Sequence, residues 1–74
     1  MPGQEDRALA RIKQTAAMIR DSKRIKVETL ESWAILNFGV RPRTIAMYVT
    51  AMIKMGTVLW DPKTKEYVWN EAEG

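Results

Sequence analysis

The side chains able to do chemistry in this chain are carboxylates, hydroxyls, amines and guanidinium groups, because the 74 residues include no histidine and no cysteine. Histidine is the usual general base of enzymes, and both missing types are the usual ligands of zinc. Disulfide bonds and thiol chemistry are excluded as well. No nucleophile–base pair and no phosphate-binding glycine loop occurs. The sequence therefore predicts a binding protein with no catalytic residues, metal or cofactor, not an enzyme.

The chain carries a net charge of +3, and its positive charge is least compensated between positions 41 and 65. That segment contains a single acid, Asp61, and five cations: Arg41, Arg43, Lys54, Lys63 and Lys65. A local positive block of this kind indicates an anionic partner such as nucleic acid or an acidic surface. The alternative is a solvated surface that is basic without any partner.

The first of three predicted helices runs from about Glu5 to Ser22, and its buried stripe consists of Leu9, Ile12, Ala16 and Ile19. Met18, flanked by Ala10 and Ala17, falls outside that stripe. This small apolar strip is either an incidental exposed methionine or the contact of a homodimer.

A short strand at 25–27 precedes the second predicted helix, which spans about Glu28 to Phe38. This helix is apolar on nearly all sides, so neighbours are expected to cover more than one of its faces and Trp33 is expected in the core. Gly39 has the position of a helix-ending C′ residue. No membrane helix is expected, because the longest uncharged stretch in the middle of the chain, 44–53, has about half of the roughly 20 residues required.

The third predicted helix begins with Pro42, a residue well tolerated at the first helical position, and continues to about Met55. Its buried stripe consists of Ile45, Tyr48, Val49, Met52 and Ile53. The opposite stripe holds Arg43, Met47, Thr50 and Lys54, with Ala46 and Ala51 as small neighbours. Two strands at 57–60 and 66–69 then form a hairpin whose turn, 61–65, has a basic tip. Aromatic residues of the two strands are expected to pair if their faces coincide.

The order of helix, short strand, helix, turn, helix and hairpin resembles the winged helix-turn-helix family of DNA-binding domains. The resemblance is carried by residues 39–45 (GVRPRTI), Val49, Met52 and Ile53, and by residues 56–58 (GTV) before the hairpin. It implies an α+β fold of three helices with a C-terminal hairpin, the wing. One domain is expected over residues 5–70, between a disordered tail at 1–4 and a disordered acidic tail at 71–74.

The resemblance implies that the third helix enters the major groove of DNA while the wing touches the backbone or the minor groove. The implied contacts are Arg43, Met47, Thr50 and Lys54 on the helix face, Arg41 and Thr44 at its start, and Lys63, Thr64 and Lys65 on the wing. Arg41 departs from the family pattern, because the position before this helix commonly holds a Ser, Thr or Asp cap. An arginine accepts no hydrogen bond and opposes the helix dipole, a local conflict that a bound phosphate would relieve.

These features predict a sequence-specific protein for double-stranded DNA, a transcriptional regulator of the cytoplasm or nucleoid. It is expected to bind as a homodimer, with no membrane and no small-molecule ligand. The alternative is a winged-helix protein-interaction module of a larger transcription, replication or membrane-remodelling assembly, since a fold does not fix a function.

Overall fold

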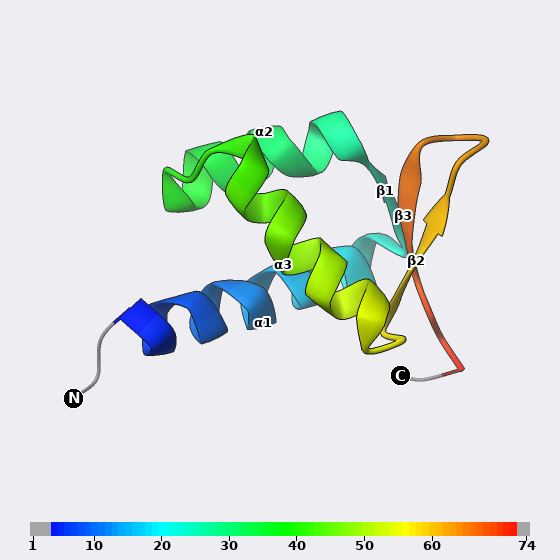
Figure 1. Cartoon of the computed structure of the whole chain (residues 1–74). Helices are drawn as coiled ribbons and strands as arrows, with labels where there is room; N and C mark the ends of the chain where they lie inside the picture. Colours follow the sequence, from blue (N-terminus) through cyan, green and yellow to red (C-terminus); the bar gives the residue numbers. More distant parts are fainter. Residues whose placement is uncertain (1–3, 73–74) are drawn as a thin grey trace.

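A computed structural model describes residues 4–72 of the chain as three helices and a three-stranded antiparallel sheet. The elements are α1 (Gln4–Ser22), β1 (Arg24–Lys26), α2 (Val27–Phe38), α3 (Pro42–Lys54), β2 (Val58–Asp61) and β3 (Glu66–Trp69). The predicted α+β fold of three helices with a C-terminal hairpin is confirmed, and its layout is compatible with a winged helix. The sheet stands at one end of the helices (Figure 1).

Most helix boundaries follow local signals in the sequence. Gly39 takes the left-handed conformation (φ 67°) after α2, and its N–H donates to the Ile35 carbonyl oxygen at 3.0 Å. The left-handed region is open to glycine because it has no Cβ. The chain then turns into α3, which begins with Pro42 as predicted. The short strand lies at Arg24–Lys26, one residue earlier than predicted, and α2 starts immediately after it.

The sheet has the strand order β1-β3-β2, so β3 pairs with both neighbours. Val58 lies opposite Trp69, and Trp60 lies opposite Tyr67, which places these four side chains on one face. The rings of Trp60 and Tyr67 have centroids 5.1 Å apart. The predicted pairing of aromatic residues across the hairpin is therefore confirmed.

The core lies where the three helices meet the inner face of the sheet. Its buried apolar residues are Ile19, Ile25, Leu30, Ala34, Ile45, Val49, Met52 and Val58. Trp33, predicted in the core, is half-buried and packs against the margin of this cluster, where it meets Phe38 edge to face with ring centroids 5.1 Å apart. The buried stripe of α3 fixes the direction of its opposite, solvent-facing stripe.

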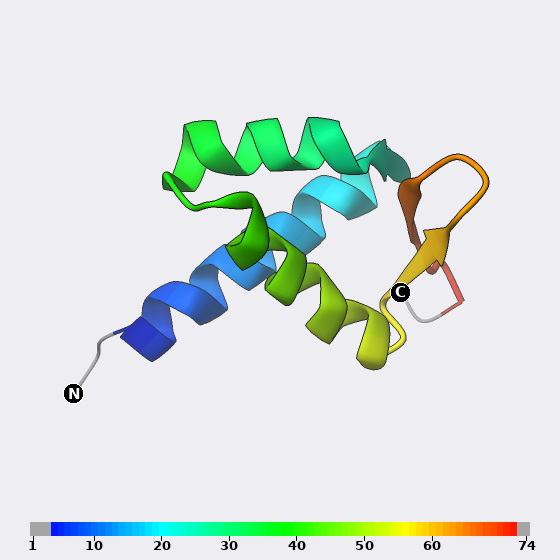
Figure 2. The same ribbon diagram turned by 45° about the horizontal axis from the view of Figure 1, so that its top comes forward.

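Several predicted core positions are wrong. Leu9 is 51% exposed, because the first turns of α1 extend away from the other elements in both views (Figures 1 and 2). Ile53 is also exposed. The prediction that neighbours cover α2 on several sides is also wrong, because Ile35 is exposed and Leu36 is 85% exposed. The elements α3 and β1 contact the inner side of α2 and leave its outer side in solvent.

Met18 is half-buried and packs against the core, since α1 is contacted by β3 as well as by α3. The incidental exposed methionine expected there is therefore wrong. Gln4, expected in the N-terminal tail, belongs to α1, and Glu71 and Ala72, expected in the C-terminal tail, form a turn. Lys23 Nζ lies 2.9 Å from Glu71 Oε1. Positions 1–3 and 73–74 of those tails lie outside the described residues.

Candidate nucleic-acid interface

The solvent-facing stripe of α3 forms the first part of the candidate site. Arg43, Met47, Thr50 and Lys54 follow one another at helical spacing and, with Ala46 and Ala51, line an open hollow of about 430 Å³. Met47 is 65% exposed in the middle of this stripe, between the two cations. The structure therefore brings together the four helix-face residues predicted from the sequence. We call these six residues the α3 face.

The start of α3 carries positive charge and lacks a side-chain cap. Arg41 occupies the N-cap position in an extended conformation (φ −77°, ψ 157°) and makes no capping hydrogen bond. Its carbonyl oxygen accepts from the N–H groups of Thr44 at 2.9 Å and Ile45 at 3.3 Å. No acidic residue lies in the first turn of α3 to balance Arg41 and Arg43. Positive side chains at a helix N-terminus oppose the helix dipole, and an anion there is stabilised by it.

The positive charges of the site are free of internal compensation. Five exposed cations form no ion pair with a described residue: Arg41, Arg43, Lys54, Lys63 and Lys65. The single acid of this segment, Asp61, is instead bound to Arg24, whose Nη2 lies 2.8 Å from the Asp61 Oδ2. Asp61, the acid of the 41–65 segment, is thus paired with Arg24, a cation from outside this segment, and not with any of the five cations.

Arg24 of β1 organises the hairpin tip, residues 61–65, and was not among the predicted site residues. Its Nε donates to Glu66 Oε1 at 2.7 Å, and its Nη2 also donates to the Thr64 hydroxyl at 3.2 Å. Hydrogen bonds from Thr64 and then from Arg24 lower the pKa of Glu66, whereas the hydrogen bonds to Glu66 and then to Asp61 raise the pKa of Arg24. Thr64, predicted as a DNA contact, is therefore engaged within the protein.

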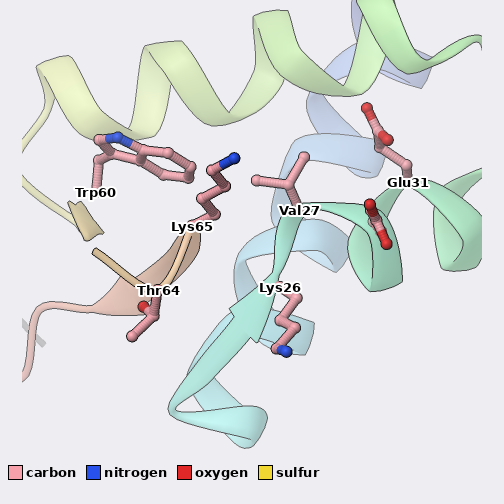
Figure 3. A pocket seen from close by; sticks show the side chains of 7 residues that line it. Lys26, Val27, Glu31, Trp60, Thr64 and Lys65 are labelled. Atoms are coloured by element: carbon pink, nitrogen blue, oxygen red, sulfur yellow. The ribbon is translucent and has the colours of Figure 1, made fainter. Parts of the chain in front are cut away.

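The hairpin tip lies against the start of α2. The Val27 N–H donates to the Lys65 carbonyl oxygen at 3.3 Å, and Lys65 has a positive φ of 57°. A second hollow of about 550 Å³ opens here, lined by Lys26, Val27, Glu28, Glu31, Trp60, Thr64 and Lys65. Figure 3 shows the Lys65 side chain between Trp60 and Val27, while Lys26 points away from them. Thr64 and Lys65 therefore line a different hollow from the α3 face.

The hollow beside the hairpin is poorly suited to a simple anion. Glu28 and Glu31 lie in its wall together with Lys26 and Lys65, so charges of both signs surround it. The α3 face has no acidic wall residue. Charge therefore favours the α3 face over the hollow beside the hairpin as a site for a polyanion. The third hollow, between α1 and α3, is smaller, at about 300 Å³, and is lined by Arg7, Ala8, Arg11 and Tyr48.

Comparison of the chain with models of protein families, with curated proteins and with solved structures finds no match. Among the described residues, no cluster of three or more carboxylates could hold a metal ion. The same part of the chain contains no helix with the length and apolar character needed to cross a membrane.

Proposed function

We propose that this protein binds double-stranded DNA as a transcriptional regulator, with α3 in the major groove and the hairpin as a wing on the backbone or minor groove. The observation that carries the proposal is the set of five exposed cations on and around α3 and the hairpin tip, none of them in an ion pair with a described residue. Uncompensated cations are what a phosphate backbone attracts, with release of its counterions. The expected location is the cytoplasm or the nucleoid.

The position of two of these cations at the start of α3 adds support to the same proposal. Arg41 and Arg43 stand where a capping oxygen and negative charge would stabilise the free protein. A DNA phosphate at this helix end would accept hydrogen bonds from the Arg41 guanidinium group and from the Arg43 N–H, since Pro42 has no N–H and those of Thr44 and Ile45 donate to the Arg41 carbonyl oxygen. Local sequence choices that weaken the free fold are expected where function requires them.

Fluorescence anisotropy with a mixed-sequence duplex of about 30 base pairs tests the proposal. We expect binding at low salt that weakens steeply as salt rises, and a loss of about tenfold or more for the double variant Arg41→Ala/Arg43→Ala. The matched control is Arg7→Ala/Lys13→Ala, which removes two exposed cations from α1 that form no ion pair with a described residue, and it should bind nearly as the parent does. Absence of binding at low salt, or equal losses for the two double variants, would contradict the proposal. The stoichiometry reports on the expected homodimer.

A second candidate function is a protein-interaction module, favoured by the large apolar side chains in solvent. Met55 is 74% exposed after α3, and Leu36 and Met47 are also exposed. Isolated exposed apolar residues are common on monomers, and these three come from separate positions of the chain. The anisotropy titration separates the two candidates, because a protein-interaction module would show no salt-dependent binding to duplex DNA.

A further inference from the structure

The α3 face has an unusual distribution of chemical groups. Cations stand at its two ends, Arg43 and Lys54, and the middle is formed by Met47 with the small side chains of Ala46 and Ala51. The whole of α3 contains no Asn, Gln, Asp or Glu, so it carries no side-chain amide or carboxylate. The lining is therefore apolar at its centre and able to donate hydrogen bonds only at its ends.

Thr50 does not change this pattern. Its hydroxyl donates to the carbonyl oxygen of Ala46, one turn earlier, at 2.8 Å. The hydroxyl hydrogen is therefore occupied within the helix, which is a common arrangement for threonine in helices. Thr50 presents its methyl group and an acceptor to a partner, and no free donor.

Base edges in the major groove differ in what they require from a side chain. Adenine is read by amides that donate and accept together, and cytosine by carboxylates that accept from its amino group. Guanine offers two acceptors to arginine or lysine, and thymine offers its methyl group to apolar side chains. The α3 face matches the last two requirements, because it has cationic donors and apolar groups but lacks amides and carboxylates.

We infer that the α3 face selects duplex sites in which thymine methyl groups lie between two guanines; this inference rests on the proposed DNA binding. Arg43 and Lys54 donate to the guanines, and Met47, with its alanine neighbours, receives the methyl groups. At 1.5 Å per residue, the two cations lie about 16 Å apart along the helix axis. Because a helix in the groove is inclined to the DNA axis, that length spans at most about five base-pair steps of 3.4 Å, with Met47 at most about two steps from the first guanine.

Replacing thymine by deoxyuridine tests the inference, because it removes the methyl group and leaves base pairing intact. Preferred sites are first selected from randomised duplexes at about 150 mM salt and are expected to contain guanine and thymine at the spacing above. Uracil at a contacted position should then weaken binding about fourfold, the value of burying one methyl-sized group. Met47→Ala should reduce this discrimination towards one. Met55→Ala, which changes a methionine outside the hollow that is 74% exposed against 65% for Met47, should retain it.

The outcomes separate the inference from the proposed function. Salt-dependent duplex binding with equal affinity for thymine and uracil sites would overturn the inference and leave DNA binding in place. Selected sites with A·T pairs at the two outer positions, or with G·C pairs throughout the middle, would overturn it in the same way. Failure to bind any duplex at low salt would overturn both. Because Met47 is exposed, its replacement leaves the core unchanged, and thermal unfolding of each variant verifies this.

Discussion

Replacing Arg41 by serine should stabilise the protein while weakening its binding to DNA. Arg41 already has the extended backbone of an N-cap and is exposed, so the substitution disturbs no packing. A serine Oγ can accept from the N–H of Arg43 or Thr44, which is worth about 1 kcal/mol relative to a residue that does not cap. Removing a cation from the positive end of the helix dipole adds about 0.3–1 kcal/mol. Their sum is about 1.5 kcal/mol of added stability.

Thermal unfolding followed by circular dichroism measures this change. For a domain of this size, about 1.5 kcal/mol raises the melting temperature by about 6–12 °C. Arg41→Ala removes the charge without providing a cap, and should therefore give only the smaller dipole contribution. Both variants should bind duplex DNA more weakly than the parent by a similar factor. An Arg41→Ser variant that melted at or below the parent's temperature would show that Arg41 does not destabilise the start of α3.

The hairpin, the sheet and the turn before α3 give three further predictions. With Arg43 and Lys54 on guanines, the three cations left for phosphates, Arg41, Lys63 and Lys65, predict a slope of log K against log salt of about −2.7, and Lys63→Ala/Lys65→Ala should reduce it to about −0.9; an unchanged slope would show that the tip does not touch DNA. Because the pKa of Glu66 is lowered in the folded protein, its contribution to stability is present above about pH 4.3 and is lost as pH falls. The free energy of unfolding, measured by tryptophan fluorescence in urea, should therefore decrease more steeply with falling pH for the parent than for Arg24→Met. Gly39→Ala should lower the free energy of unfolding by about 1–2 kcal/mol through backbone strain alone, since a Cβ there meets no atom within 4 Å; an unchanged urea midpoint would exclude such strain.

Local signals were sufficient to predict the helices. Proline at the first position of α3 and glycine after α2 act on the backbone within a few residues, so boundaries came out within about one residue. Periodicity also identified the buried stripe that turns Arg43, Met47, Thr50 and Lys54 outwards. These parts of the fold and the candidate site depend on the sequence immediately around them.

The misjudged parts depend on distant segments. Periodicity assigns Leu9 to the inner face of α1 but does not say that neighbouring elements are too short to reach it. The three partners of Arg24 lie 37, 40 and 42 positions away, so its role in the hairpin could not be predicted without the fold. A signal was present in the alternation of Arg24, Ile25 and Lys26, which predicts an outward-facing Arg24 beside whichever strand pairs with it.

The central position of β3 in the sheet orders the events of folding. The three helices and the hairpin form through contacts close in sequence, whereas pairing of β1 with β3 closes a loop that contains all of α2, α3 and β2. Closing a loop of about 40 residues costs about 3 kcal/mol of chain entropy, and the core contacts that form with this pairing must offset that cost. During synthesis, the segment from β1 to β2 therefore leaves the ribosome before the strand that completes its sheet. Until Trp69 has emerged, Ile25 and Val58 lack their strand partner, and the nascent chain exposes apolar surface to its surroundings.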